Sequence, residues 1–182
     1  MRTLDGIAEP APQTVAGRLE TLGVSVAMSA PDRPLPVTID VPLLPGWSET
    51  SSMDFPGARV LVNLPAAEQG FTPNAVLLHG RLTGRVDSDW LLKGAFEDSR
   101  RLPCWAERET STLDFLGCRS AFVCGTYAVD SWVLQATTRY LVVDDESGQY
   151  LTQLTLTRLS SQVGDLDTDV TVINLGLQVL RH

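Results

Sequence analysis

The sequence predicts an α+β fold, a single domain built on a twisted, mostly antiparallel β-sheet that is flanked by helices. Its length of 182 residues suits one domain, since a chain of this size buries roughly 70% of its unfolded surface. Between residues 118 and 159, three long runs alternate apolar and polar side chains, which is the period of an antiparallel strand. Segments with the period of an amphipathic helix precede and follow these runs and can cover the sheet.

The first segment is rich in proline and alanine, so we expect a flexible tail at residues 1–13 and the domain at residues 14–182. Thr14 can cap a short helix, and Gly23 occurs where helices often end in a left-handed residue. Two strands are expected next, on either side of the rigid linker "SAPDRPLP", at residues 24–28 and 37–41.

A second helix has clearer signals. Asp87 is a good N-cap, Val86 and Leu91 are placed for a hydrophobic staple, and Pro103 ends the helix. Two strands are expected before it, at residues 58–64 and 74–82.

The alternating runs predict an antiparallel meander with turns at Asp130 and at "DDESGQ". The runs occupy residues 118–129, 131–143 and 150–159. In the middle run, Gln135, Thr137 and Arg139 fall on the face opposite the apolar side chains. That face is polar enough to meet water or a partner, whereas the other face needs helices packed on it.

The last segment, residues 164–180, fits two interpretations. Apolar residues recur at helical spacing, but the β-branched run "DVTVI" also alternates like a strand. We favour a helix that ends in a short strand. Its apolar face would consist of Leu166, Val170, Ile173 and Leu177.

Charge and hydropathy exclude several classes of partner. The net charge is −8, and the basic residues form no stripe, so nucleic acid is not an expected partner. The apolar runs are far shorter than the ~20 residues of a transmembrane helix. The start of the chain has no signal peptide or lipoprotein cysteine. We therefore expect a cytoplasmic protein if Met1 is the native start, and an exported envelope protein if the chain is a truncated lipoprotein.

The sequence contains few of the residues that form a metal or thiol site, with two histidines and three cysteines. Cys118 and Cys124 fall on one strand, and with His79 they could hold zinc, but no CxxC pair is present. We therefore expect buried, inert thiols and no metal or cofactor.

Two acidic clusters in the sequence do not meet the requirements of a functional site. The run "DLDTDV" lacks the glycine and glutamate that a calcium loop starting at Asp165 requires, so an exposed helix N-terminus is the better interpretation. Asp144, Asp145 and Glu146 fall in a hairpin turn, where burial does not raise a carboxyl pKa. Neither cluster predicts general acid–base catalysis.

Aromatic side chains are the remaining candidates for a site. Large aromatics anchor cores or line ligand pockets. Trp47 and Trp105 flank turns, and Phe71 lies in a predicted loop. We expect these three residues either to anchor the core or to contact a partner or ligand.

Several motifs occur in a collinear order that resembles the LpqN/LpqT family of actinobacterial, chiefly mycobacterial, proteins. The most specific is a strand followed by Pro42, Pro45, Gly46 and Trp47. The others are "NAVLLHGRLTGRVD" and "RLPCW", and the resemblance extends from residue 14 to about residue 160.

This resemblance implies a Mog/PsbP-like α/β/α sandwich, a fold related to adaptors, extrinsic subunits and secretion-linked chaperones. Members are typically exported lipoproteins linked to the cell envelope. This chain differs by having Cys104 where the family tends to have glycine. A reactive thiol at that position is therefore conceivable.

Together these observations predict a non-enzymatic binding or adaptor module that engages a protein partner or a lipid-like ligand through the sheet face or the loops around Trp47, Phe71 and Trp105. One alternative is a thiol-dependent hydrolase, which would need Cys124 or Cys104 within hydrogen-bond reach of His79. The other is a structural, self-associating subunit, which light scattering would detect. The sequence leaves the partner and the oligomeric state open.

Overall fold

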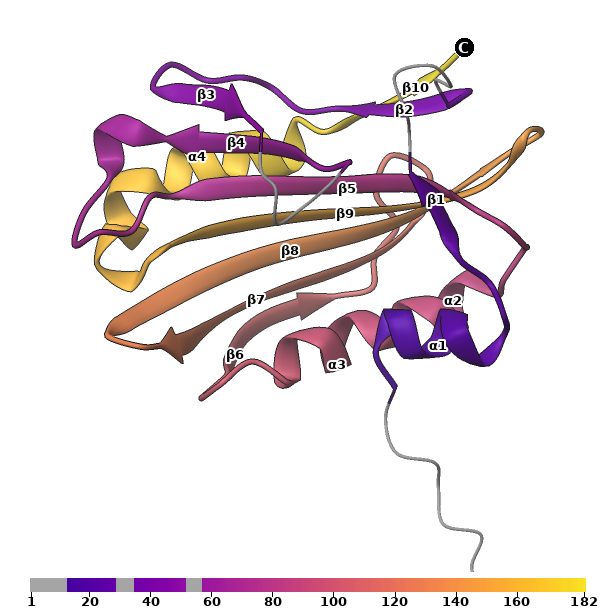
Figure 1. Ribbon diagram of the computed structural model, residues 1–182, viewed down its shortest axis with the longest axis horizontal. Helices are drawn as coiled ribbons and strands as arrows, with labels where there is room; N and C mark the ends of the chain where they lie inside the picture. Colours follow the sequence, from indigo (N-terminus) through magenta and orange to yellow (C-terminus); the bar gives the residue numbers. More distant parts are fainter. Residues whose placement is uncertain (1–12, 29–34, 52–56) are drawn as a thin grey trace, which may run out of the picture.

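The central element of the fold is an antiparallel sheet. The computed structural model describes residues 13–28, 35–51 and 57–182, so residues 1–12 of the predicted tail and 29–34 of the predicted linker lie outside the described residues. Within the described parts the sheet has eight strands in the order β3-β4-β5-β9-β8-β7-β6, with β1 also paired to β5 (Figure 1). The strands are β1 (Val26–Met28), β3 (Trp47–Thr50), β4 (Arg59–Asn63), β5 (Asn74–Leu82), β6 (Ala106–Ser111), β7 (Arg119–Val129), β8 (Trp132–Asp145) and β9 (Gly148–Leu159).

The predicted meander is confirmed as β7, β8 and β9. Its pairing places Phe122, Arg139 and Leu154 side by side across the three strands. Asp130 has a φ of 52° in the turn between β7 and β8, a left-handed conformation that aspartate tolerates better than most residues. The alternation read from the sequence therefore assigns each side chain of β8 to the correct face.

One face of the sheet is covered by α1 (Val15–Thr21), α2 (Ser88–Leu92) and α3 (Gly94–Arg100) (Figure 1). The predicted caps are present, because Thr14 Oγ1 accepts from the N–H of Gly17 and Asp87 Oδ1 accepts from the N–H of Trp90. The helix expected after Asp87 is interrupted at Lys93. At Gly94 the backbone of α1 comes so close that a Cβ would lie 2.5 Å from the nitrogen of Val15.

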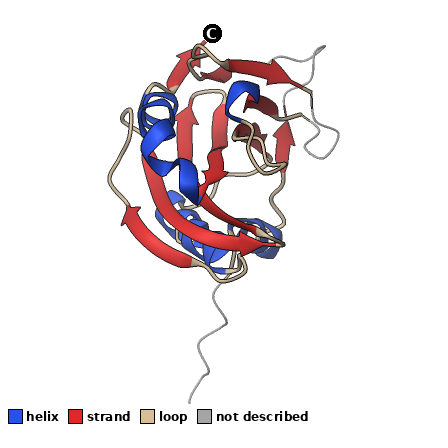
Figure 2. Ribbon diagram, turned by 90° about the vertical axis from the view of Figure 1, so that its left-hand side faces the viewer, coloured by secondary structure: helices blue, strands red, loops and turns tan. Residues whose placement is uncertain are grey.

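The opposite face is covered by α4 (Val163–Leu175) and by a small ribbon of β2 (Val37–Asp40) and β10 (Gln178–Arg181) (Figure 1). The favoured interpretation of the last segment, a helix ending in a short strand, is therefore confirmed. Two 3₁₀ turns, η1 (Leu64–Ala66) and η2 (Ser160–Gln162), complete the described elements. Figure 2 shows the curvature of the sheet between its two covering layers.

Two hydrophobic cores result, one on each face. The first lies between the sheet and α1–α3 and includes Leu91 and Ala95, both fully buried. The second lies under α4 and β2 and includes Trp47, Leu154 and Ile173. None of the helices in the described ranges is long and apolar enough to span a bilayer.

Candidate ligand-binding pocket beside helix α4

Helix α4 leaves part of the sheet uncovered on its own side. Beside β6, β7 and β8 the molecule has a pocket of about 540 Å³, within the range of sites for small ligands. Its floor is formed by the polar face of β8 that the sequence indicates, namely Gln135, Thr137 and Arg139. These three side chains are buried rather than open to water. The floor therefore belongs to a concave site and not to a flat exposed surface.

Strand pairing builds this floor in rows. Ser111 on β6 is opposite Phe122 on β7, which is opposite Arg139 on β8. Paired residues direct their side chains to the same face of a sheet. The next row contains Glu109, Cys124 and Thr137. Both rows line the pocket.

The wall of the pocket on the helix side comes from α4. Asp167, Val170, Thr171 and Asn174 recur at positions i, i+3, i+4 and i+7 and line the pocket, so they share one face of the helix. Ile173 packs instead into the second core, and Leu166 is also buried, as the sequence predicts. The helix thus presents an apolar stripe to the core and a more polar flank to the pocket.

Arg158 lies at one end of the floor, and its side chain is 5% exposed. Its guanidinium donates to Gln135 Oε1 at 2.9 and 2.6 Å and to the carbonyl oxygen of Val163 at 3.0 Å. It also forms an ion pair with Asp167. Its positive charge is therefore compensated within the protein.

Arg139 lies in the middle of the floor and is 9% exposed. Its guanidinium donates to Asn174 Oδ1 at 3.0 and 2.9 Å and to Ser120 Oγ at 3.3 Å. It stacks between two rings, with its central carbon 4.1 Å from the centroid of Phe115 and 5.1 Å from that of Phe122. Burial lowers the pKa of Arg139, while the charge of Glu109 acts in the opposite direction.

The rim of the pocket is apolar. Leu113, in the loop after β6, is 79% exposed, and Leu175, at the end of α4, is 57% exposed. Both line the pocket. Phe115 and Phe122 continue this apolar lining inward to Arg139. The pocket therefore has an apolar entrance and a polar, cationic floor.

The structure places Trp47 in the second core. It is 5% exposed, and its indole N–H donates to Asp169 Oδ2 at 2.8 Å. Gly46 before it has a φ of 86°, a left-handed conformation that favours glycine. The Pro-Gly turn therefore directs the ring inward, and Trp47 ties β3 to α4 instead of forming a surface.

Phe71 and Trp105 lie apart from this pocket. Phe71 is half-buried and packs edge-on against Trp132, with centroids 5.6 Å apart. Trp105 precedes β6, which is at the opposite edge of the sheet from β3, and its ring lies against Gly125. The three predicted aromatic residues therefore do not form one surface. A binding role for Phe71 or Trp105 stays a prediction.

The thiols and His79 are also separated. Cys124 is on β7 and His79 is on β5, with β8 and β9 between them, which corresponds to about 14 Å at the usual strand spacing. Both ring nitrogens of His79 are engaged, with Thr152 Oγ1 at 2.9 Å and the carbonyl of Val37 at 2.8 Å. Burial lowers the pKa of His79. Cys104 is exposed in the turn after α3, with a φ of 54°.

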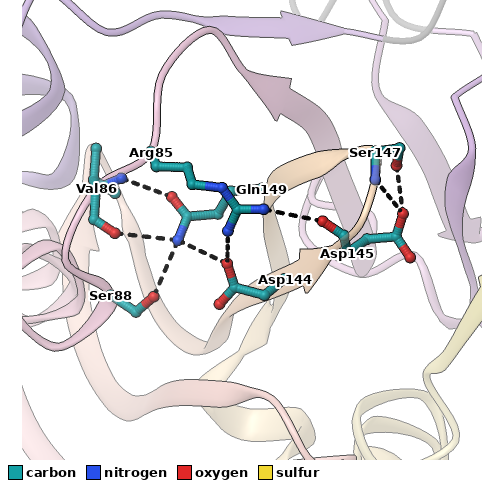
Figure 3. Close-up of polar contacts among 7 residues, drawn as sticks. All are labelled: Arg85, Val86, Ser88, Asp144, Asp145, Ser147 and Gln149. Carbon is teal, nitrogen blue, oxygen red and sulfur yellow. Dashed lines mark hydrogen bonds and ion pairs between the residues drawn. The ribbon is translucent and has the colours of Figure 1, made fainter.

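The acidic hairpin between β8 and β9 has a structural role (Figure 3). Asp145 accepts from the backbone and hydroxyl of Ser147, and these bonds lower the pKa of Asp145. Arg85 forms an ion pair with Asp144 at 3.0 Å. Gln149 is buried and bonds both the N–H and the carbonyl of Val86. Together these contacts fasten the hairpin to the segment that enters α2.

The acidic start of α4 is only partly an exposed cap. Asp165 is exposed in the first turn, but Asp167 pairs with Arg158 and Asp169 accepts from Trp47. The described residues contain no cluster of three or more His, Cys, Asp or Glu side chains suited to a metal ion. The acids of this segment therefore fasten α4 to the sheet.

Arg139, Arg158 and Asn174 were not predicted as site residues. Two signals could have indicated them: the polar alternation of β8, and the polar residues at helical spacing from Asp167 to Asn174. Each pattern is visible in the sequence. The contact between the side chains of β8 and those of α4, however, depends on where α4 packs on the sheet. That docking places residues 35 positions apart in one hydrogen-bonded pair.

The fold shows that the protein is an α+β sandwich, in which one antiparallel sheet lies between two covering layers. A concave pocket lies beside one of these layers. The solution structure of PsbP (CyanoP) from Synechocystis has this fold, with a TM-score of 0.51, 11% identity and 98% coverage of each chain. The crystal structure of LpqN from Mycobacterium tuberculosis is much more similar, with a TM-score of 0.81, 19% identity, and coverage of 93% of this chain and 99% of that one.

The chain belongs to the family described as "Probable lipoprotein LpqN", whose sequence profile matches residues 11–180. It is 27% identical to the proline-rich 28 kDa antigen of Mycobacterium tuberculosis over 93% of this chain and 54% of that protein. It is 28% identical to the "Putative lipoprotein LpqT" of Mycobacterium leprae over 88% and 73% of the two chains. The chain thus spans about half the length of the proline-rich antigens. The expected family and fold are confirmed.

Proposed function

We propose that this chain is a binding protein whose ligand, a lipid-like amphiphile, occupies the pocket between α4 and strands β6–β8. The observation that carries this proposal is the division of the 540 Å³ pocket into a polar floor and an apolar rim. Ligand sites typically combine apolar walls with a few well-positioned polar groups. A ligand that matches this division would place its polar end on the floor and its apolar part at the rim.

The exposed leucines at the rim support the apolar half of this ligand. Leu113 and Leu175 expose large side chains next to a cavity instead of packing into a core. Covering such a surface releases about 25 cal/mol for each Å² of apolar area removed from water. An alkyl chain that lies across both residues would gain this energy on binding.

The side chains of the described residues support binding rather than catalysis. A thiol-dependent hydrolase would need Cys124 or Cys104 beside His79. Cys124 is separated from His79 by two strands, and both ring nitrogens of His79 are engaged by other groups. Two of the three hairpin carboxylates, Asp144 and Asp145, have structural partners (Figure 3).

We place this binding role at the cell envelope. The relatives LpqT and LpqN are described as lipoproteins, and the solved LpqN is described as involved in cell envelope biogenesis. An amphiphile is a common cargo in that setting, since envelope lipids must be shielded from water when they leave a membrane. Fractionation of an actinobacterial host that expresses the full-length gene would test this location.

The test of binding uses two matched variants on β6. Ser111 lines the pocket, and the neighbouring Thr110 points to the other face because side chains alternate along a strand. Ser111→Trp should fill the pocket, while Thr110→Trp should leave it open. We expect the neutral dye Nile red to bind the wild type and Thr110→Trp, and to lose most of its affinity for Ser111→Trp.

A complementary measurement identifies the natural cargo. Organic extraction of the protein purified from an actinobacterial host, followed by mass spectrometry, should recover an amphiphile from the wild type and much less from Ser111→Trp. Equal dye binding and equal lipid recovery for all three proteins would exclude this pocket as the site.

A further inference from the structure

Two arginines are buried in the described part of the chain, and they differ in how their charges are compensated. Arg158 forms an ion pair with Asp167. Arg139 forms hydrogen bonds only to the neutral groups of Asn174 and Ser120, and no ion pair with a described carboxylate. The structure therefore contains one buried positive charge that lacks a negative partner.

Such a charge is costly to maintain. Moving a guanidinium out of water carries a penalty of several kcal/mol that neutral hydrogen bonds offset only in part. An arginine stays protonated at neutral pH even when burial lowers its pKa. Buried charges are therefore usually paired, and a well-ordered exception that lines a pocket calls for an explanation.

Arg139 is also held in a fixed orientation. The rings of Phe115 and Phe122 stack on its guanidinium, and Asn174 Oδ1 accepts from both Nε and Nη2. Three of its five N–H groups are thus used, through Nε, Nη1 and Nη2, which leaves two without an acceptor among the described residues. Little conformational entropy remains to be lost when a ligand binds to these donors.

The neighbouring amide of Asn174 is incompletely satisfied as well. Asn174 is 3% exposed, and its Nδ2 is buried with no hydrogen-bond partner among the described residues. Its orientation is fixed because Oδ1 accepts from Arg139. Arg139 and Asn174 both line the pocket, and both carry N–H groups without an acceptor among the described residues.

We propose that the pocket lining beside Arg139 and Asn174 binds the anionic group of the ligand, so that the amphiphile carries a carboxylate or a phosphate that pairs with Arg139. This proposal rests on the proposed function and specifies its ligand. Guanidinium groups bind both anions through two parallel N–H donors. The alkyl part would then extend past the two phenylalanine rings to Leu113 and Leu175.

The carboxylates around the pocket are compatible with an anion at this place. Asp167 is paired with Arg158, and Asp114 is paired with Arg119 at 3.1 Å. Glu109 lines the pocket, but it is exposed and forms no ion pair with Arg139. Its repulsion of an anion would be weakened by water and salt.

Matched amphiphiles test this proposal in the intact chain, delipidated on a hydrophobic resin. Dodecanoate, dodecyl phosphate and dodecan-1-ol share one alkyl chain and differ in head group, and each can displace Nile red. We expect the two anions to bind the wild type at least about tenfold more tightly than the alcohol, the usual effect of a hydrogen bond to a charged group.

Variants of Arg139 separate recognition from a structural role. Arg139→Met should reduce the preference for anions over the alcohol to about onefold, and Arg139→Lys should retain part of it as a point charge. The control is Arg108→Met, which removes the same charge from an exposed position on β6 and should keep the wild-type preference. If Arg139→Met fails to fold, the wild-type preference and the Arg139→Lys result still decide the question.

The outcomes distinguish the two proposals. Equal affinity of the wild type for all three amphiphiles would overturn the anion proposal and leave the proposed binding function intact. Failure of every amphiphile and of Nile red to bind the wild type would overturn both. The last measurement uses acetate and inorganic phosphate, which lack an alkyl chain. If they bind as tightly as the amphiphiles, the ligand is a small free anion and not an amphiphile.

Discussion

The two faces of the sheet treat polar groups differently. On the α1–α3 face, the packed residues are almost all apolar, and the buried hydroxyl of Tyr140 donates to Asp98 Oδ2 at 2.9 Å. On the α4 face, the adjacent residue of β8, Arg139, is buried and forms no ion pair with a carboxylate of the described residues, although the charge of Glu109 acts on it. The neutral hydroxyl of Tyr140 thus has a carboxylate partner on the α1–α3 face. The cation of Arg139 has no carboxylate in an ion pair on the α4 face among the described residues.

This difference suggests a separate role for each face of the sheet, one in stability and the other in ligand binding. On the α1–α3 face the buried hydroxyl of Tyr140 has an acceptor, whereas the buried indole N–H of Trp105 has none among the described residues. The energy of this face comes mainly from burial of apolar surface. Each face has a pocket, of about 410 Å³ on the α1–α3 face and about 540 Å³ on the α4 face. The pocket of the α4 face is lined by the buried cation of Arg139 and by Asn174, whose Nδ2 has no partner among the described residues. We infer that the first face mainly stabilises the fold and that the second gives up some stability to hold a ligand.

The largest expected effect contrasts one leucine from each face. Leu91 is fully buried on the α1–α3 face, whereas Leu175 is 57% exposed at the pocket rim. Leu91→Ala should lower the free energy of unfolding by about 2–5 kcal/mol, and Leu175→Ala by less than about 0.5 kcal/mol. Urea unfolding followed by fluorescence measures both. Dye binding should show the reverse order, and a Leu175→Ala protein that binds Nile red normally would contradict the role of the rim.

The second prediction tests whether the ion pair of the buried Arg158 with Asp167 contributes to the stability of the protein. Asp167→Asn removes the negative charge beside Arg158, whose side chain is 5% exposed. We expect a loss of about 1–3 kcal/mol in unfolding free energy, since a buried charge is left with neutral partners. Asp165→Asn is the control, because Asp165 is in the same helical turn and is exposed like Asp167 but forms no ion pair among the described residues. It should cost at most about 0.5 kcal/mol. Equal effects of the two changes would show that the Arg158–Asp167 pair contributes nothing specific.

The sequence indicates much of this fold because local patterns determine it. Thr14 and Asp87 cap the predicted helices, and the alternation of β8 assigns Arg139 and Tyr140 to opposite faces. The edge strands β3 and β6 escape prediction because their side chains are mostly exposed and polar. An edge strand needs no apolar alternation, since much of its surface meets water.

The candidate site is harder to predict than the fold. The sequence leaves Trp47 open between anchoring the core and contacting a partner, and the structure decides for the core, where Asp169 accepts its N–H. The contact of Arg139 with Asn174 likewise depends on the docking of α4. Local propensities do not encode such tertiary contacts. Two sequence patterns indicate polar surfaces that could form a site, namely the residues at positions 135, 137 and 139 and the polar residues at helical spacing between 167 and 174.

The third effect asks whether the polar cluster of the pocket is needed for stability. Asn174→Leu alone should destabilise the protein, because Arg139 then loses two of its three hydrogen bonds. The double variant Arg139→Met with Asn174→Leu replaces the whole pair by apolar side chains. It should be as stable as the wild type or about 1 kcal/mol more stable, and it should lose the preference for anionic amphiphiles. A double variant less stable than Asn174→Leu would mean that the cluster serves the fold.

The smallest effect concerns pH dependence on the other face. Burial raises the pKa of Asp98, although the hydrogen bonds from Tyr140 and Val15 and the charge of Arg101 oppose the shift. The folded state therefore holds the Asp98 proton more tightly than the unfolded state, whose carboxyl titrates near pH ~3.9. The stabilisation is complete below that pH and is lost as the pH rises through the higher folded-state pKa.

Asp98→Asn keeps a neutral acceptor in place of the carboxylate and should remove this dependence. Relative to the wild type, its unfolding free energy should rise as the pH increases above about 4, and it should level off once the pH exceeds the raised folded-state pKa of Asp98. Urea midpoints of the two proteins across this range give the difference directly, since all other titrations are shared. A difference that stays constant would show that Asp98 is ionised throughout, and the α1–α3 face would then hold a buried charge as the α4 face does.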